Sequence, residues 1–427
     1  MRQVNGLLYI ANEFPPLGGS GIQRSLKFVK YLSALGEKVT VISKDDQDSL
    51  QDPTMTAEIP KNVKVYRLKP CSIINKKGLL KYPYKLLSKI ISPDYEHFWQ
   101  KKNMDTVRNI VKKENIGTVI SSSFPYSSHI MAMELKKSFP ELIWIADFRD
   151  EWTNNPYHLD SFFNRIKLKS EKRMELAVTS SCDFLIANTP IMLQNFIADM
   201  PSLAGRSTFL PNGYDEADFE GIHRPLQKNI KFTITYSGSL YGRRNLDDFF
   251  EALKLLAGQN KINLDDIRLN IIGNIYPSAI EAYENNYGLK GRIHFKGYLP
   301  HKKAIEELAS SDMLVLVIGA GKGSKNFYTG KVFEYMRSFT PILAIVPEDG
   351  VAAGVIEETN TGKVINPGDT ERIAQAISDI YTDFKLDHKP KADMGALEKY
   401  SRLNQAKKLQ SIIKELDERR KNEKNTF

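Results

Sequence analysis

The chain has 427 residues, two cysteines and a net charge of +9 at pH 7. This length favours two domains of about 200 residues each, and two cysteines are too few for a disulfide scaffold. No apolar run approaches the ~18 residues that a membrane span needs, and no charged leader precedes the first apolar run. The composition therefore excludes disulfide-rich secreted proteins and membrane-spanning proteins, and we expect a cytoplasmic protein.

The first elements along the chain form a βαβ unit. Residues 7–11 are apolar, as in a buried strand, and apolar residues recur at helical spacing over residues 22–35. Ser20 and Gln23 fit a capping box at the start of this helix. Residues 38–43 (KVTVIS) then predict a second strand.

The turn between the first strand and the helix is rich in glycine and proline. It reads NEFPPLGGSGIQRS over residues 12–25 and includes Gly18 and Gly19. Ligands bind at the carboxyl ends of strands in open parallel sheets, where glycine lets a phosphate approach the backbone. The alternative is a tight turn that needs positive φ and has no ligand.

The alternation of strands and helices continues along most of the chain. We predict a Rossmann-like, doubly wound α/β domain over residues 1–205 and a second one over residues 206–399. We expect a C-terminal helix over residues 400–427 to pack back on the first domain. The later strands are predicted at 63–68, 118–121, 143–147 and 184–188 in the first domain, and at 232–237, 269–273, 293–297, 313–318 and 342–346 in the second.

Positive charge is concentrated between Arg67 and Lys113, where twelve lysine and arginine residues stand against three acidic residues. Within this stretch, residues 76–91 place apolar residues on one helical face and lysines on another, which is typical of a helix at a membrane surface. A surface helix that packs on its own domain is the alternative. We expect peripheral contact with the inner face of the cytoplasmic membrane and, without a recognition module, no nucleic acid partner.

Two loops of the second domain carry residues suited to a nucleotide. Residues 237–244 (SGSLYGRR) follow a strand, and their glycines and paired arginines suit a diphosphate. Residues 319–334 (GAGKGSKNFYTGKVFE) follow another strand and end on Glu334, whose carboxylate can accept both hydroxyls of a ribose. The loop is not a Walker motif, because the order glycine, lysine, serine or threonine with its required spacing is missing. A loop with solvated arginines and a flexible surface loop are the alternatives.

Polar residues also follow two strands of the first domain. Asp147, Arg149 and Asp150 come at the end of one strand, and His129 lies in the segment SSSFPYSSHIMAM after another. Such positions beside a cleft suit contacts with an acceptor or a sugar. Alternatively, His129 begins a helix without a catalytic role, and Arg149 pairs with a neighbouring aspartate.

Six motifs follow one another in an order that resembles the retaining GT-B glycosyltransferases of glycosyltransferase family four. They are FPPLGGSG, LPNGYDEADF, YSGSL, LNIIGN, HFKGYLP and GKVFEYM with PILAI, and they span essentially the whole chain. The resemblance implies two Rossmann-like domains that face a central cleft. It also implies a nucleotide-sugar donor held by the second domain and a glycan or lipid-linked glycan acceptor held by the first.

The resemblance assigns roles by position. Glu334 matches the second glutamate of the family's E-x7-E motif, which holds the donor ribose, and Asn326 stands at the position of the first glutamate. Ser239 stands where the diphosphate clamp usually has arginine, and Arg243 or Arg244 replaces its lysine. The predicted catalytic residues are Lys331, Arg243, His129 and Asp150; the predicted donor contacts are Gly18, Gly19, Gly238, Ser239, Arg244, Gly273, Tyr298, Asn326, Thr329, Gly330 and Glu334; the predicted acceptor contacts are Asp147 and Arg149.

The sequence thus predicts a retaining hexosyl- or N-acetylhexosaminyltransferase that uses a UDP-sugar in the synthesis of a cell-surface polysaccharide. Cations and loop amides would stabilise the leaving diphosphate, so neither a metal nor another cofactor is expected. One alternative is a nucleotide-sugar 2-epimerase, which shares the fold but needs no acceptor. Another is a degenerate transferase that binds a partner without turnover.

Overall fold

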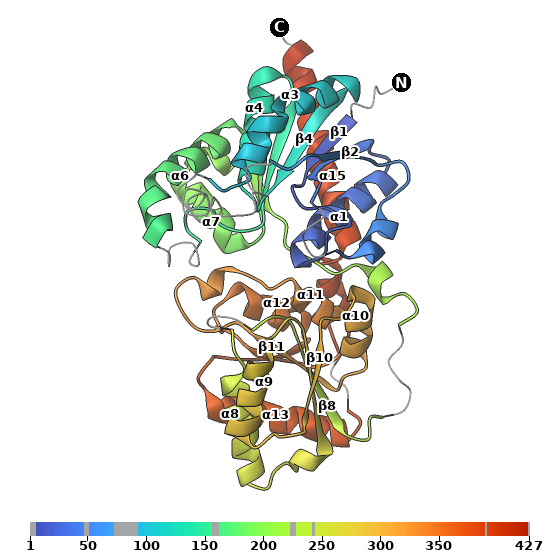
Figure 1. Ribbon diagram of the computed structural model, residues 1–427, viewed down its shortest axis with the longest axis vertical. Coiled ribbons are helices and arrows are strands. Elements are labelled where there is room, and N and C mark those ends of the chain that lie inside the picture. Colours follow the sequence, from blue (N-terminus) through green and yellow to red (C-terminus); the bar gives the residue numbers. More distant parts are fainter. Residues whose placement is uncertain are drawn as a thin grey trace, which may run out of the picture. The chain divides into compact units, whose positions relative to one another are not determined.

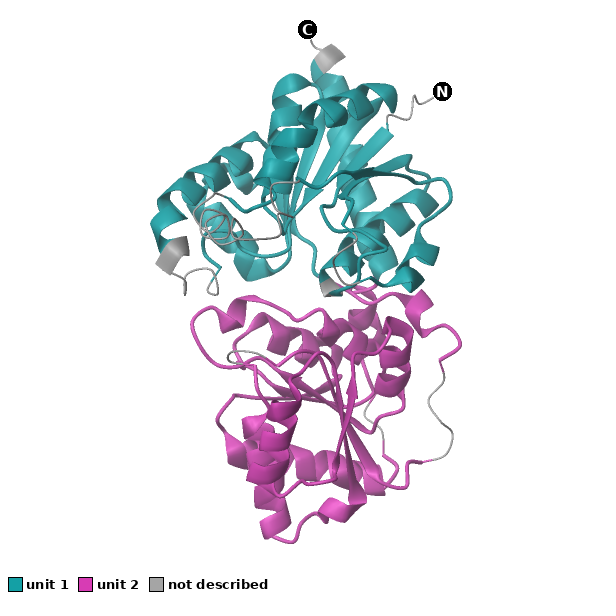
Figure 2. Ribbon diagram, in the orientation of Figure 1, with its two compact units in different colours: residues 1–211, 402–427 teal, residues 212–401 magenta. Residues whose placement is uncertain are grey.

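The chain forms two compact units, which Figures 1 and 2 show. The computed structural model describes residues 6–46, 51–71, 93–155, 162–222, 228–240, 244–388 and 391–425. Unit 1 consists of residues 1–211 and 402–427, and unit 2 of residues 212–401. The sequence placed these two boundaries after residues 205 and 399.

Unit 1 is built on seven parallel strands in the order β3-β2-β1-β4-β5-β6-β7. The strands are β1 Gly6–Ile10, β2 Val39–Lys44, β3 Lys64–Leu68, β4 Ile116–Ser122, β5 Ile143–Phe148, β6 Phe184–Ala187 and β7 Ser207–Phe209. The helices are α1 Ser20–Ala34, α3 His97–Lys113, α4 Ser127–Ser138, α6 Phe162–Ser181, α7 Pro190–Asp199 and α15 Arg402–Asn425, with short 3-10 turns η1 Pro53–Glu58 and η2 Pro201–Leu203.

Both faces of the unit 1 sheet are buried. In β1, Leu8 and Ile10 belong to the core that includes residues of α3, α4 and α7, whereas Leu7 and Tyr9 belong to the core that includes residues of α1 and α15. A strand whose alternate side chains are all buried is apolar throughout, which explains the uninterrupted apolar runs of the sequence. The predicted α/β class is therefore confirmed.

Helix α15 completes one face of unit 1. It packs against α1, and its buried residues Ala406, Leu409, Ile412 and Ile413 join the core on that side (Figure 1). The side-chain amide of Gln410 also donates hydrogen bonds to the loop after α1. The last helix of the chain is thus a structural part of the unit with which the chain begins.

The start of α1 differs from the sequence prediction. Gly19 is the N-cap, at φ 123°, and no side chain caps the helix. The predicted capping box is therefore wrong, because Ser20 is already the first helical residue and cannot serve as the cap. A residue at φ 123° is strained unless it is glycine, so the backbone conformation rather than a side-chain hydrogen bond determines this helix start.

Unit 2 repeats the architecture with six parallel strands in the order β10-β9-β8-β11-β12-β13. The strands are β8 Phe232–Ser237, β9 Ile267–Ile272, β10 Ile293–Gly297, β11 Met313–Val317, β12 Ile342–Ile345 and β13 Gly362–Ile365. The helices are α8 Asp247–Gly258, α9 Pro277–Tyr287, α10 His301–Ala309, α11 Lys331–Arg337, α12 Val351–Thr359, α13 Thr370–Lys385 and α14 Met394–Glu398, with 3-10 turns η3 Glu216–Phe219, η4 Leu264–Asp266 and η5 Ser324–Asn326.

None of the helices in the described ranges combines the length and the apolar character that crossing a bilayer requires. The basic segment 76–91 lies outside the described residues. Its contact with a membrane therefore stays a prediction.

Candidate functional site

Two glycines pack against each other where β8 and β9 end side by side in unit 2. Gly238 follows β8 at φ 143°, and Gly273 follows β9 at φ 140°. A Cβ atom on Gly273 would lie 2.2 Å from the carbonyl oxygen of Gly238, and a Cβ atom on Gly238 would lie 1.3 Å from Nζ of Lys331. We call these two glycines the glycine platform; the space that a side chain on Gly238 would fill holds the Lys331 ammonium group, and the space beside Gly273 holds the Gly238 carbonyl.

Lys331 is the first residue of α11, and its side chain reaches the glycine platform. Its Nζ lies 5.3 Å from the centre of the Tyr236 ring, a favourable distance for a cation over an aromatic face. Within the described residues, this Nζ forms no hydrogen bond and no ion pair. Burial, and secondly the nearby Arg244 cation, lower the pKa of Lys331 to about 7, although Glu334 acts in the opposite direction. The site thus holds a desolvated amine that is partly protonated near neutral pH and whose charged form an incoming anion would stabilise.

Two tyrosines fix the loop that carries the platform. The backbone amide of Ser237 donates a hydrogen bond of 2.8 Å to Oη of Tyr335, which is fully buried in α11. The hydroxyl of Tyr236 donates to the carbonyl oxygen of Ser239 at 3.1 Å. Sequence reasoning missed both tyrosines as site residues, although a tyrosine directly after Glu334 in the motif FEYM was a usable signal.

Glu334 lies one turn after Lys331 on α11. Its Oε1 is 2.9 Å from Nε2 of His301, the first residue of α10. The Nδ1 atom of the same ring lies 4.0 Å from Oδ2 of Asp218 in η3. The Glu334 side chain is 25% exposed. His301 and Asp218 were not predicted as site residues.

The other predicted donor residues of unit 2 lie on the loops that follow the strands. Asn326 ends η5, Gly330 is the exposed N-cap of α11, and Tyr298 follows β10 and is 51% exposed. The hydroxyl of Thr329 is buried, and nothing in the described part of the chain bonds to it. Ser239 follows the glycine platform; Arg243 lies outside the described residues. Gly18 and Gly19 belong to unit 1.

A pocket of about 470 Å³ also opens at the carboxyl ends of unit 2 strands. Its lining comes from the loops that follow β11, β12 and β13, and it includes Ser324 of η5. Lys325 in this lining is paired with Asp349. The pocket is therefore a polar depression beside the loop that leads to Lys331.

In unit 1, the predicted residue Asp147 is engaged in a buried ion pair. Its Oδ1 lies 2.6 Å from Nη2 of Arg24, and its Oδ2 accepts a hydrogen bond of 2.9 Å from the hydroxyl of Ser122. Arg24 also donates to the carbonyl oxygens of Leu210 and Pro211. The Arg24 guanidinium and these hydrogen bonds hold the pKa of Asp147 below its usual value against the effect of burial.

Arg149 is held by backbone carbonyls. It donates hydrogen bonds to the carbonyl oxygens of Gly21, Ser123 and Phe124. Instead of the expected alternative, a pair with a neighbouring aspartate, Arg149 forms contacts that join the first turn of α1 to the loop after β4. Asp150, the next residue, is exposed.

His129 is a buried residue of α4. Its Nδ1 lies 2.8 Å from Oγ of Ser121, its ring centre lies 4.2 Å from that of Phe148, and none of its surface is exposed. Burial lowers the pKa of His129 to about 3. The ring is therefore neutral at physiological pH, and its predicted catalytic role is untested.

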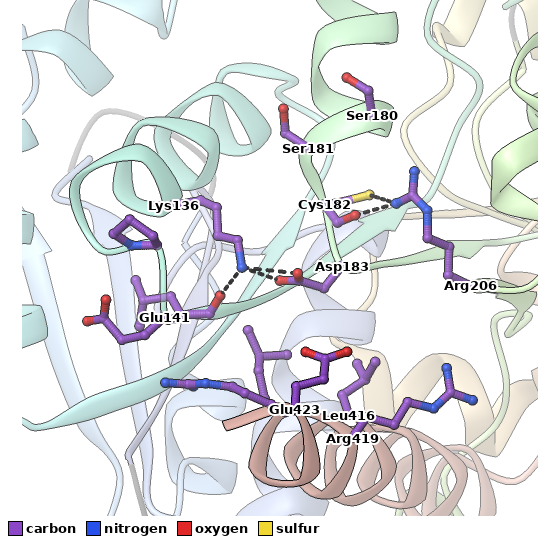
Figure 3. A pocket seen from close by; sticks show the side chains of 14 residues that line it. Lys136, Glu141, Ser180, Ser181, Cys182, Asp183, Arg206, Leu416, Arg419 and Glu423 are labelled. Carbon is purple, nitrogen blue, oxygen red and sulfur yellow. Dashed lines mark hydrogen bonds and ion pairs between the residues drawn. The ribbon is translucent and has the colours of Figure 1, made fainter. Parts of the chain in front are cut away.

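A larger pocket, of about 810 Å³, lies at the amino ends of β5 and β6 in unit 1 (Figure 3). Three of its cations have protein partners: Lys136 pairs with Asp183 at 2.9 Å, Arg206 donates to the carbonyl oxygens of Thr179 and Cys182, and Arg419 pairs with Glu415. Ligands of parallel sheets bind at the carboxyl ends. We therefore place the candidate site at the glycine platform.

The comparisons with known proteins concern the fold and the class of this chain. Residues 231–383, which lie within unit 2, match the family described as Glycosyl transferases group 1. The mannosylfructose-phosphate synthase of Agrobacterium fabrum is 20% identical in an alignment of 330 residues that covers 71% of this chain and 67% of that protein.

Solved structures share the whole architecture. A glycosyltransferase from Rickettsia africae has a TM-score of 0.65 and 17% identity over 97% of this chain and 98% of that one. Sucrose-phosphate synthase from Thermosynechococcus elongatus has a TM-score of 0.63 and 16% identity over 96% of this chain and 99% of that one. The GT-B fold is thereby confirmed, and the matches support the group 1 class.

Proposed function

We propose that this protein is a retaining glycosyltransferase that transfers a hexosyl or N-acetylhexosaminyl group from a UDP-sugar to a glycan or lipid-linked glycan. We infer a role in the synthesis of a cell-surface polysaccharide. The reaction would occur on the cytoplasmic side of the membrane. Residues 76–91 would provide a peripheral contact there, because their lysines suit an anionic surface.

The single observation that carries the proposal is the Lys331 ammonium group on the glycine platform. A half-buried cation without a hydrogen-bond partner in the described structure is costly unless a ligand supplies the negative charge. Because Gly238 has no side chain, the Lys331 ammonium group lies directly against the backbone at the end of β8, where it would meet the diphosphate. The match of this unit to group 1 glycosyltransferases supports the assignment.

The proposed mechanism is electrostatic. Charge develops on the leaving diphosphate in the transition state, and Lys331, with Arg243 and Arg244 as further cations, stabilises that charge. The leaving phosphate then accepts the proton of the acceptor hydroxyl while the new glycosidic bond forms on the same face. These cations would make a metal unnecessary, so transfer should survive EDTA; loss of activity on chelation that Mg²⁺ or Mn²⁺ restores would contradict this step.

The first test is the binding of UDP, GDP and ADP and their sugars to the whole protein, measured by thermal stabilisation and then by calorimetric titration. We expect one base to be preferred and the variant Lys331→Ala to bind it about 10- to 150-fold more weakly, the value of one charged hydrogen bond. Lys254→Ala, at an exposed lysine of α8, is the matched control and should bind normally. Wild-type affinity in Lys331→Ala would refute the site.

A second test separates transfer from epimerisation and from simple binding. A transferase releases UDP faster when an acceptor glycan is added, whereas an epimerase interconverts sugar nucleotides without an acceptor. A degenerate protein would bind nucleotide but would show neither reaction. Acceptor-dependent release of UDP is the outcome that we expect.

A further inference from the structure

We propose that His301 is a positioning residue that holds the Glu334 carboxylate in the orientation in which it binds the donor ribose, an inference that rests on the proposed function. The two side chains come from different helices, α10 and α11, and meet at 2.9 Å between Nε2 and Oε1. Both are partly exposed, His301 at 20% and Glu334 at 25%. A ligand can therefore reach the carboxylate while His301 holds it.

The imidazole ring lies between two carboxylates. An ionised carboxylate only accepts hydrogen bonds, so a distance of 2.9 Å to Glu334 requires Nε2 of His301 to carry the proton. Asp218, at 4.0 Å from Nδ1, lies on the other side of the ring. Since α10 packs against η3, which contains Asp218, the ring is oriented from both sides.

This arrangement prepares Glu334 for a pair of hydroxyls. A carboxylate has about four lone-pair positions, and His301 uses one of them at Oε1. Oε2 remains available, together with the other position on Oε1. Without His301 the terminal torsion of a glutamate is broad, so the carboxylate would spend less time in an orientation that accepts both ribose hydroxyls. The diphosphate, which Lys331 would bind, should not be affected.

A nearby ion pair provides the matched control. Arg337 lies on the same helix as Glu334, and it binds Glu216 of η3 through Nε at 2.8 Å and Nη2 at 2.6 Å. This pair joins α11 to η3, as the His301 contacts join α11, α10 and η3. Its ion pair goes to Glu216 and not to Glu334. Loss of Arg337 therefore tests the packing of η3 without removing the contact to Glu334.

The experiment compares each ribonucleotide with its deoxy form. Calorimetric titration of the whole protein with UDP, GDP or ADP, whichever binds best, is repeated with dUDP, dGDP or dADP. We expect the wild type to prefer the ribonucleotide by about 10-fold or more, the value of a charged hydrogen bond. His301→Ala should lose most of this preference by weakening the ribonucleotide more than the deoxynucleotide, which keeps one of the two hydroxyls. His301→Gln should restore part of the preference through its amide N–H, and Arg337→Gln should keep it.

Two results would overturn the role of His301. One is an unchanged preference for the ribonucleotide in both His301→Ala and His301→Gln, and the other is an equal loss of affinity for the ribonucleotide and the deoxynucleotide in His301→Ala. Failure of the proposed function looks different. In that case no nucleoside diphosphate binds the wild type, or Glu334→Ala retains the full preference for the ribonucleotide. A preference for the ribonucleotide that depends on Glu334 but not on His301 would agree with the proposed function and would contradict only the role of His301.

Discussion

The two units both place cations near the carboxyl ends of their parallel strands, but the cations differ in what they contact. In unit 1, Arg24 binds Asp147 and two backbone carbonyls, and Arg149 binds three carbonyls. In unit 2, Lys331 reaches the glycine platform, and Nζ has no hydrogen bond within the described residues. A cation whose donors are all used by the protein is structural, whereas one that is desolvated without an anion is suited to a ligand.

The largest expected effect comes from breaking the pair in unit 1. Arg24→Met leaves the Asp147 carboxylate buried without its partner, which should lower the free energy of unfolding by about 3–5 kcal/mol. Chemical denaturation of the variant measures this. Lys331→Met should show no such loss, because it replaces a desolvated cation with an apolar side chain. Equal destabilisation by the two substitutions would remove the distinction between the units.

The next effect is a dependence of nucleotide binding on pH. Lys331 has a pKa of about 7 in the free protein, and a bound diphosphate would raise it, so binding takes up a proton. UDP affinity should therefore fall as pH rises above 7, by about 10-fold between pH 7 and 8.5. The free energy of unfolding depends on pH in the opposite direction. The pKa of Lys331 is lower in the folded protein than in the unfolded chain, so the unfolded chain binds the proton more tightly and the folded protein becomes less stable as pH falls from 10.5 towards 7.

Titrations at several pH values measure this linkage. Lys331→Met should bind weakly and with little dependence on pH in the same range, since the titrating group is gone. A wild-type affinity that is constant from pH 7 to 8.5 would show that Lys331 does not meet the diphosphate.

A smaller effect is expected from filling the platform. In Gly238→Ala the new methyl group takes the place of the Lys331 ammonium, which must move, and we expect UDP to bind about fivefold more weakly. Gly221→Ala is the matched control, because Gly221 also has positive φ but has open space around its Cα. Both variants should lose about 1–2 kcal/mol of stability through backbone strain. Only the first should lose affinity, as paired unfolding and binding measurements would show.

The smallest effect is expected where a cation is paired at the surface. Arg337 and Glu216 form such a pair, with side chains 22% and 54% exposed. Arg337→Ala should cost at most about 1 kcal/mol, because exposed pairs are screened by water. Thermal unfolding and UDP titration should both remain close to wild type. A large loss of affinity would mean that pairing with a protein carboxylate does not separate structural cations from ligand-binding ones.

Much of the fold could be predicted from sequence, because strands buried on both faces are continuous apolar runs. The predicted strands 232–237 and 293–297 coincide with β8 and β10. The prediction missed β7 and β13, which are short and whose residues are mostly half-exposed or exposed. Because such strands lack an apolar run, the sequence does not indicate them. The structure identifies them through their pairing with β6 and β12.

The candidate site was predicted in part. The three-residue spacing of Lys331 and Glu334 places them on the same face of α11, and the glycine after β8 was apparent from SGSL. The contact between Lys331 and Gly238 joins residues that are far apart in the sequence, as does the pair of Arg24 with Asp147. Local patterns carry no information on such contacts, so the sequence could not separate paired from unpaired cations.

The return of α15 to unit 1 has a consequence for synthesis on the ribosome. Ala406, Leu409 and Ile412 complete a core whose other members, such as Leu26 of α1, are made first, and all of unit 2 is made in between. Unit 2 is continuous in the chain and can fold as soon as it emerges. In unit 1, the part of α1 that packs against α15 stays uncovered until the last helix arrives, so the unit that is translated first is completed last.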